Sequence, residues 1–287
     1  MNNSLFPEEK PVPSSLPKKE APLARRVAPK SLDEILGQSH ILGEGKLLRR
    51  AIEADRITSI ILYGPPGCGK TALARVIAMR TKAVVEPLNA VLAGVTDIRR
   101  VVKSAQERFT TAQRATILFL DEIHRFSKTQ QDALLPHVEN GLFTLIGATT
   151  ENPYFSIVSP LLSRSQIFEF KALSEEDIQV LLNRALTHRG RGFSGIEIQI
   201  EPEAAAYIAK FSEGDGRRAI NALELAILTT KPVENTICIT LPIAAESIQQ
   251  KLLHYDGSGI LIMMRHPPSS KVCAGVIRMP RYSGWHA

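Results

Sequence analysis

The strongest chemical signal in the chain is the segment 64–71, which reads Gly-Pro-Pro-Gly-Cys-Gly-Lys-Thr. It fits the pattern G-x-x-x-x-G-K-[ST], in which backbone N–H groups and a helix N-terminus surround the phosphates of a nucleotide. An apolar strand predicted at 60–63 precedes the segment, and an amphipathic helix is predicted after it, which is the context that the motif requires. We therefore expect ATP and Mg²⁺ as cofactors, bound by Gly64, Pro65, Pro66, Gly67, Cys68, Gly69, Lys70 and Thr71. Lys70 would contact the β- and γ-phosphates, and the Thr71 hydroxyl would coordinate Mg²⁺.

An acidic pair, Asp121 and Glu122, ends a second apolar strand predicted at 117–120. Ligands of open α/β sheets bind at the carboxyl ends of the strands. We expect Asp121 to hold Mg²⁺ through water and Glu122 to polarise the attacking water as a general base. Asp-Glu-Ile-His also occurs in superfamily-two helicases, but no second helicase domain or further helicase motif is recognisable. His124 is interpreted as a polar residue that begins the next helix, without a catalytic role.

Short apolar strands alternate with amphipathic helices from about residue 25 to residue 170. The strands are predicted at 60–63, 84–85, 117–120, 145–148 and 167–170. Continuous apolar runs suit parallel strands that are covered on both faces, so the alternation predicts an α/β fold with a parallel sheet. Beyond residue 171 the strand signal fades, and helices are predicted at 174–186, 202–211 and 217–229. A small α-helical lid domain should therefore follow the α/β domain.

The composition is that of an ordinary globular chain: 287 residues, 44% apolar and 22% charged. No apolar run is long enough to span a membrane, and the N-terminus lacks the pattern of a signal peptide. The three cysteines have no paired spacing, which argues against a disulfide scaffold and a zinc site. The net charge is +6, but four of these charges lie in residues 257–287, which hold no acidic residue, so charge is weak evidence for DNA binding. We expect a cytoplasmic protein.

Taken in order, these motifs resemble the AAA+ ATPases, specifically the clamp-loader-like replication-associated recombination protein A family, whose eukaryotic relative is the Werner helicase-interacting ATPase. The similarity covers residues 22 to 256 and includes further segments. Residues 32–38 look like the segment that packs around the adenine, which makes Gln38 a candidate nucleotide contact. Residues 147–153 resemble sensor 1, with Thr150 positioning the γ-phosphate and water.

The resemblance also implies roles for two arginines. Arg164 ends a segment, 161–164, that resembles the clamp-loader arginine-finger motif and would reach into the ATP of a neighbouring subunit. Arg217, in the sensor-2-like segment 214–218, would contact the nucleotide of its own subunit; Arg218 is a weaker candidate. Phosphoryl transfer spreads negative charge over the γ-phosphate, so an added arginine lowers the barrier. Each arginine alone is equally well explained as a solvated or structural cation.

Two positions depart from the family pattern. Val27-Ala28-Pro29 replaces the usual Arg-Pro before the adenine segment, a change that still permits adenine binding. Cys68 occupies a variable position in the phosphate loop. Because a helix N-terminus lowers the pKa of a thiol, Cys68 is a candidate reactive thiol, although no function is needed to explain its presence.

The chain is expected to comprise a flexible proline-rich arm (1–24), the AAA+ domain (25–170), the lid (171–241) and the start of a C-terminal oligomerisation domain (242–287). From Ile260 onward there is no helical period and no carboxylate. When the tail is back-translated and read one base out of frame, a permitted translation closely resembles the family continuation. Our hypothesis is a frameshift near Gly259, which would leave the tail unpacked and impair activation by Arg164; the alternative is a divergent natural terminus. DNA sequencing across the Gly259 codon decides between them.

The resemblance implies a homo-oligomeric, DNA-dependent ATPase that acts at replication forks, gaps or duplex ends in replication, recombination and repair. It would be cytoplasmic and nucleoid-associated, with DNA as a partner and a single-stranded DNA-binding protein or sliding clamp as further candidates. The basic clusters at 99–103 and 184–191 are candidate DNA contacts and equally well solvated helix faces. A clamp-loader subunit, a Holliday-junction branch-migration motor and an ATP-binding interaction protein without turnover remain alternatives.

Overall fold

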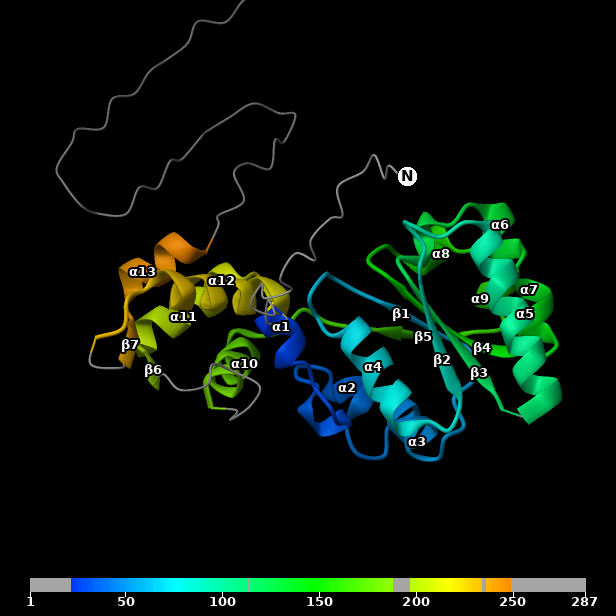
Figure 1. Ribbon diagram of the computed structural model, residues 1–287, viewed down its shortest axis with the longest axis horizontal. Coiled ribbons are helices and arrows are strands. Elements are labelled where there is room, and N and C mark those ends of the chain that lie inside the picture. Colours follow the sequence, from blue (N-terminus) through cyan, green and yellow to red (C-terminus); the bar gives the residue numbers. More distant parts are fainter. Residues whose placement is uncertain (1–21, 113, 188–196, 234–235, 249–287) are drawn as a thin grey trace, which may run out of the picture. The chain divides into compact units, whose positions relative to one another are not determined.

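The computed structural model describes residues 22–112, 114–187, 197–233 and 236–248, which form an α/β lobe and a mainly helical lobe (Figure 1). The expectations for most of the arm and for the tail from Ile260 lie outside the described residues. Within the described part of the chain, no helix combines the length and apolarity needed to cross a membrane.

A parallel five-stranded sheet forms the centre of the α/β lobe, as predicted. Its strands are β1 (Ile60–Tyr63), β2 (Val84–Asn89), β3 (Thr116–Asp121), β4 (Phe143–Thr149) and β5 (Gln166–Glu169). Their spatial order is β2-β3-β4-β1-β5, and each neighbouring pair is parallel. The strand predicted at 84–85 continues to Asn89 through Pro87. β2 is an edge strand, where a proline is tolerated because one side of the strand needs no ladder donor.

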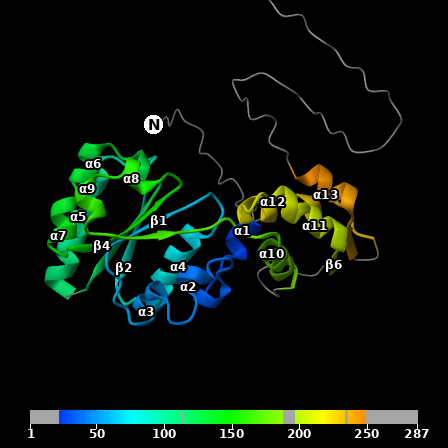
Figure 2. The same cartoon turned by 180° about the vertical axis from the view of Figure 1, so that it is seen from behind.

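Alternate residues of each central strand pack on opposite faces of the sheet. Ile60 and Leu62 of β1 belong to one core cluster with α4 (Lys70–Arg80), whereas Ile61 belongs to a second cluster with α5 (Val95–Ala112). Figures 1 and 2 show α2 (Ser39–Leu42), α3 (Leu47–Glu53) and α4 on one side of the sheet. On the other side lie α5, α6 (Lys128–Asp132), α7 (Leu135–Glu139), α8 (Pro153–Ser156) and α9 (Ser159–Leu162). Because both faces are covered, the central strands β1, β3 and β4 are mostly apolar and buried, whereas the edge strands β2 and β5 also carry exposed polar residues.

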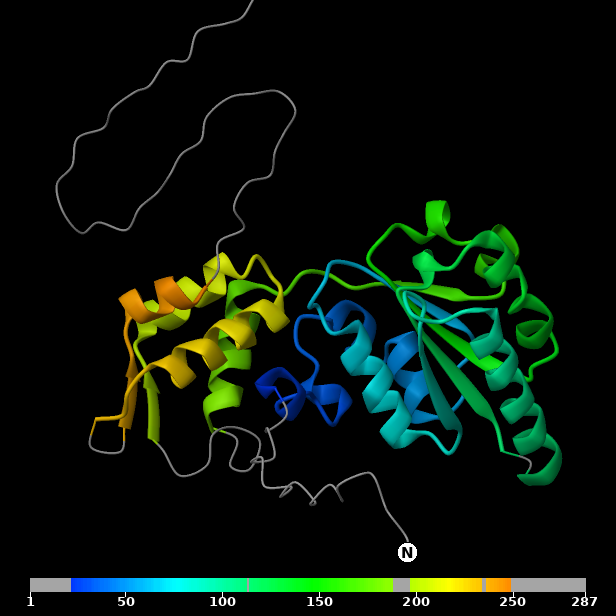
Figure 3. The same ribbon diagram turned by 45° about the horizontal axis from the view of Figure 1, so that its top comes forward.

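The helical lobe contains the three helices predicted for the lid: α10 (Glu175–Thr187), α11 (Pro202–Phe211) and α12 (Gly216–Thr229) (Figure 3). α10 begins with the expected capping box. The Ser174 Oγ accepts from the Asp177 N–H and the Asp177 carboxylate accepts from the Ser174 N–H, both at 3.1 Å. Ile178, Leu182, Ile208 and Leu223 are fully buried in a core that the lobe forms for itself.

Two short strands in this lobe were not predicted. β6 (Glu197–Ile200) and β7 (Thr236–Ile239) form a parallel pair in which Ile200 lies opposite Ile239. Ile237 and Ile239 are buried, and the less buried Thr236 and Cys238 alternate with them, so the sequence of β7 does have the two-residue alternation of a strand. Each strand has only four residues, which is too short to stand out from a helical background.

Both ends of the helical lobe differ from the expected boundaries. Leu23, in α1 (Leu23–Arg26), is buried in the core of this lobe, and its N–H donates to Glu224 of α12 at 2.9 Å. The segment expected to be flexible through residue 24 therefore enters this lobe at Leu23. At the other end, Ala244 of α13 (Leu241–Ser247) and Ile248 are buried in the same core, so the boundary expected at 241 is too early.

Candidate active site

The phosphate loop joins the carboxyl end of β1 to α4. Gly69 is the N-cap of α4 and adopts a φ of 106°, which a residue with a side chain rarely adopts. Lys70 is buried at 8% exposure, and its Nζ donates to the carbonyl oxygens of Gly64 and Pro65, each at 2.7 Å. The loop thus holds an ammonium group with two neutral acceptors, which the stronger acceptor oxygens of a nucleotide phosphate could replace.

Thr71 and Asp121 supply oxygen ligands at the start of α4 and the end of β3. The Thr71 hydroxyl lies 3.4 Å from the Asp121 carboxylate. Mg²⁺ prefers oxygen ligands and is typically bound through one or two protein side chains together with phosphates and waters. This pair fits such a shared ion. No cluster of three or more His, Cys, Asp or Glu side chains that could hold a metal ion occurs among the described residues.

Glu122 follows Asp121 directly and has a left-handed backbone, with φ 56° and ψ 44°. This conformation costs a residue with a side chain on the order of 1 kcal/mol, and such strain often accompanies function. The structure brings Glu122 into the same cavity as Lys70, Thr71 and Asp121. A cation, a carboxylate and a pair of oxygen-bearing side chains suited to Mg²⁺ therefore converge at the carboxyl edge of the sheet.

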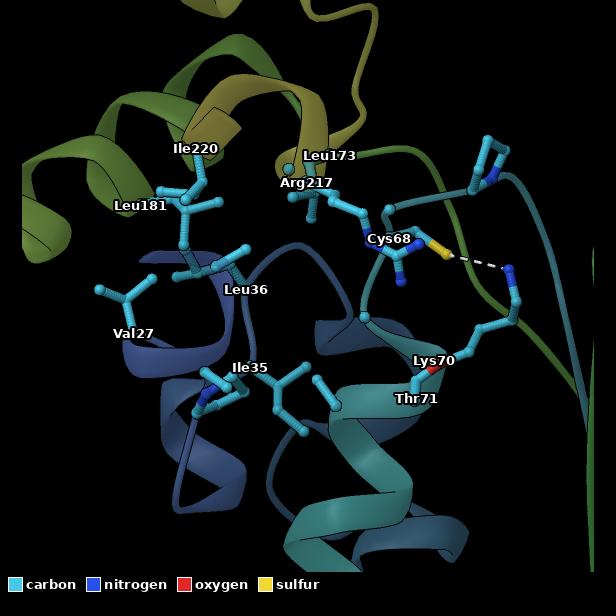
Figure 4. A pocket seen from close by; sticks show the side chains of 18 of the residues that line it. Val27, Ile35, Leu36, Cys68, Lys70, Thr71, Leu173, Leu181, Arg217 and Ile220 are labelled. Atoms are coloured by element: carbon cyan, nitrogen blue, oxygen red, sulfur yellow. Dashed lines mark hydrogen bonds between the residues drawn. The ribbon is translucent and has the colours of Figure 1, made fainter. Parts of the chain in front are cut away.

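The cavity has a volume of about 610 Å³ and has two chemically different ends (Figure 4). Lys70, Thr71 and Cys68 lie at one end, and Val27, Leu36, Leu181 and Ile220 lie at the other. A polar end and an apolar end suit the phosphates and the base of a nucleotide. Thr150 and Arg217 also line the cavity, as expected for residues that contact a nucleotide within one chain.

Gln38 does not line the cavity, contrary to the expectation that it contacts a nucleotide. Segment 32–38 does reach the cavity through Glu34, Ile35 and Leu36. The Gln38 side chain is buried and exchanges two hydrogen bonds with the backbone of Lys171, 2.8 and 3.0 Å long. Its amide also donates to the Cys68 carbonyl at 3.4 Å. Gln38 therefore links the phosphate loop to the backbone at Lys171, and its polar atoms are engaged there and not with the cavity.

Cys68 also differs from expectation. The thiol is buried at 1% exposure and donates to the Pro65 carbonyl at 2.9 Å. Burial raises the pKa of the Cys68 thiol, and the nearby Lys70 cation opposes this shift only in part. Cys68 is therefore a packed, protonated thiol and not the reactive one that its place in the sequence suggested.

Arg164 lies away from the cavity, between α9 and the edge strand β5. Its guanidinium forms an ion pair with Glu139 at 2.6 Å and donates to the Pro160 carbonyl at 2.9 Å. The side chain remains 42% exposed. Since Arg164 does not line the nucleotide cavity of its own chain, a contact with nucleotide would have to involve another chain.

Arg25, Arg75 and Arg184 also line the cavity, although the sequence did not single them out for it. Arg184 had been a candidate DNA contact, and its guanidinium donates to the Glu34 carbonyl instead. An arginine on a helix has the same sequence signature whether it faces solvent or a ligand. For Arg184, its contact with the Glu34 carbonyl and its place in the cavity wall distinguish a ligand-facing arginine from a solvent-facing one.

Comparison with known proteins agrees with this geometry. The family model described as "ATPase family associated with various cellular activities (AAA)" matches residues 60–173, and the AAA C-terminal domain matches 194–259. Replication-associated recombination protein A of Escherichia coli (strain K12) is 50% identical over 204 residues, which cover 71% of this chain and 45% of that protein. The protein of the same name from Bacillus subtilis is 44% identical over 239 residues, or 83% and 56%. This chain belongs to the replication-associated recombination protein A family of AAA ATPases.

The resemblance extends to eukaryotes and to solved structures. ATPase WRNIP1 of Dictyostelium discoideum is 39% identical over 211 residues, which cover 74% of this chain and 24% of that protein. The RuvB Holliday junction branch migration motor of Thermotoga maritima superposes with a TM-score of 0.58 at 28% identity, covering 77% of this chain and 72% of that one. The chain spans about half the length of the bacterial relatives named above.

Proposed function

We propose that this chain binds ATP with Mg²⁺ and hydrolyses the bond between its β- and γ-phosphates. The observation that carries the proposal is the convergence of Lys70, Thr71, Asp121 and Glu122 in one cavity. Its polar end suits phosphates and its apolar end suits a base. Membership of an ATPase family supports the same activity.

The chemistry follows from the positions of these groups. Lys70 exchanges its two carbonyl acceptors for phosphate oxygens, while the loop N–H groups and the start of α4 bind the remaining oxygens. Bound Mg²⁺, held by Thr71 and Asp121, would neutralise negative charge on the phosphates. Glu122 accepts a proton from the attacking water, and Thr150 orients that water and the γ-phosphate. Arg217 contacts the nucleotide from α12 of the same chain.

We further propose that Arg164 completes the site of a neighbouring copy of this chain. Its position outside its own cavity, half-exposed beside the edge strand, supports a role between subunits. An arginine that reaches the γ-phosphate from another subunit stabilises the charge of the transition state and contributes about 10³–10⁵ in rate in known cases. Hydrolysis would then depend on assembly and hence on protein concentration.

The biological setting that we propose is replication-associated recombination with DNA as the stimulating partner. The names of the relatives support it. A single-stranded DNA-binding protein or sliding clamp as a further partner, and a cytoplasmic, nucleoid-associated location, are parts of the same proposal. The likeness to the RuvB motor favours branch migration as a second candidate function.

The test measures the rate of ATP hydrolysis per chain against protein concentration, with no DNA, forked DNA or a four-way junction. We expect the rate per chain to rise with concentration and with forked DNA; a stronger response to the junction supports the second candidate. Glu122→Gln and Arg164→Ala should each be inactive alone. Their mixture should regain activity, because a subunit with an intact Glu122 can then receive an intact Arg164 from its neighbour. Arg50→Ala removes an exposed arginine on α3, outside the cavity and outside both basic clusters, and serves as the control. A mixture as inactive as its parts would refute the role of Arg164 between subunits.

A further inference from the structure

His124 has a buried imidazole, and neither the sequence analysis nor the proposed chemistry assigns it a role. It lies in the short helical turn Ile123–Arg125 that follows Glu122, and its side chain is only 5% exposed. Burial of a histidine without polar partners is unfavourable, so its contacts should be specific.

One imidazole ring contacts the ends of two neighbouring strands. Its Nδ1 lies 3.0 Å from the Thr149 hydroxyl at the end of β4 and 3.4 Å from the Glu122 carboxylate after β3. Its Nε2 lies 3.6 Å from the Glu151 carboxylate. The ring therefore links the expected general base to the turn 149–151, which contains Thr150 of the cavity wall.

The surrounding donors and acceptors indicate which ring nitrogen carries the proton. The Thr149 hydroxyl oxygen accepts the Glu151 N–H at 3.0 Å, and its own proton is directed toward the Glu151 carbonyl, 3.5 Å away. A protonated Nδ1 donates to that oxygen and faces the Glu122 carboxylate favourably. An unprotonated Nδ1 would oppose its lone pair to the carboxylate. The 3.6 Å between Nε2 and the Glu151 carboxylate is too long for a hydrogen bond, so the geometry assigns the donor to Nδ1 of His124.

We propose that His124 is a positioning residue that fixes the Glu122 carboxylate relative to the turn 149–151, so that the base and Thr150 act on the same water. The proposal rests on the proposed function of Glu122. The left-handed backbone of Glu122 is a conformation that persists only when its surroundings enforce it, and His124 is a neighbour that contacts its carboxylate. A carboxylate displaced by about 1 Å from its reacting position loses up to about a hundredfold in rate.

Steady-state ATP hydrolysis by three variants tests this role. The side-chain nitrogen of asparagine lies where Nδ1 of histidine lies, and that of glutamine lies where Nε2 lies. We expect His124→Ala to lower kcat by about tenfold or more while KM changes by less than about twofold, because positioning acts on the chemical step. His124→Asn should recover most of kcat, and His124→Gln should not. The matched control is His137→Ala, which should keep the wild-type kcat; His137 lies in α7 and packs against Phe143 of β4.

A second comparison tests the path through Thr149. Thr149→Ser keeps the hydroxyl, and we expect it to retain activity, whereas Thr149→Val should lower kcat as His124→Ala does. If the two residues act as one unit, the double variant His124→Ala/Thr149→Val should be no slower than the slower single variant.

The outcomes of these experiments distinguish a failure of the positioning role from a failure of the proposed function. A wild-type kcat in His124→Ala, equal recovery by asparagine and glutamine, or losses that follow the melting temperature of each variant would overturn the positioning role. Activity retained by Glu122→Gln would overturn the proposed function itself. An inactive Glu122→Gln together with a fully active His124→Ala would refute only the role of His124.

Discussion

Gly67 is the residue at which the phosphate loop contacts the start of α12, and a methyl group placed there should separate the two. Gly67 has a φ of 69°, and a Cβ on it would lie 1.8 Å from Oδ1 and 3.0 Å from Cα of Asp215. Asp215 cannot simply rotate away, because Oδ1 accepts the N–H groups of Arg217 and Arg218 at 2.9 and 3.1 Å as the N-cap of α12. The Gly216 N–H also donates to the Gly67 carbonyl at 3.3 Å.

The magnitude follows from two separate costs. The left-handed backbone alone costs alanine about 1–2 kcal/mol. Relief of the clash removes the N-cap of α12, which costs a further 0.5–2 kcal/mol or so. We therefore expect Gly67→Ala to lower the free energy of unfolding by about 1.5–4 kcal/mol. Gly45→Ala is the matched control, since Gly45 has a φ of 73° and no atom within 4 Å of its Cβ position. It should lose only about 1–2 kcal/mol.

Urea unfolding of both variants measures this difference, and titration with Mg·ATP measures its consequence for the site. Because Arg217 lies at the start of α12 and lines the cavity, Gly67→Ala should bind ATP more weakly, while Gly45→Ala should bind as the wild type does. Adding Asp215→Ala to Gly67→Ala should cost less than the sum of the single changes. Equal losses of stability and unchanged affinity in both glycine variants would show that the loop and α12 do not meet in solution.

Three further predictions concern the site and its surroundings. Thr71→Val and Asp121→Asn should each raise the Mg²⁺ concentration needed for half-maximal hydrolysis by about tenfold, the lower end of the effect of losing an interaction on a bound metal; unchanged Mg²⁺ titrations would contradict their assignment. Because burial raises the pKa of the Cys68 thiol and covers it, Cys68 should be alkylated more slowly at pH 7–8 than the exposed Cys238, and its own reaction should rise only at higher pH; peptide mass mapping of the labelled chain checks this. Arg164→Ala should change the free energy of unfolding by less than about 1 kcal/mol, because its ion pair is half-exposed; a larger loss in urea unfolding would indicate a structural residue.

Local sequence signals anticipated the α/β lobe well. Continuous apolar runs predicted the central strands because a strand that is buried on both faces needs apolar residues at most positions. The edge strands β2 and β5 were predicted from shorter apolar runs. Gly64–Thr71 and the pair Asp121–Glu122 could be singled out as candidates for a similar reason: their expected chemistry depends on neighbours in the chain and on the strand that precedes them. The capping box at Ser174 is equally local.

Features that depend on distant contacts were missed. Gln38 looks like a nucleotide contact in the sequence, but its partner is Lys171, 133 residues away. The thiol of Cys68 was a candidate for reactivity because its burial is not visible in the loop sequence. His124 gained its partners only when β3 and β4 were placed side by side. In each case the deciding quantity was burial or a long-range hydrogen bond.

Every role proposed for the site requires that the loop at residues 64–71 binds a nucleoside triphosphate. The measurement is a calorimetric titration of Mg·ATP into Glu122→Gln, in which turnover is blocked, and into the same protein carrying Lys70→Ala. We predict saturable binding of one ATP per chain by the first protein and no measurable binding by the second, because the second lacks the cation held over the phosphate loop. The same affinity in both proteins, or no binding by either, would contradict the account.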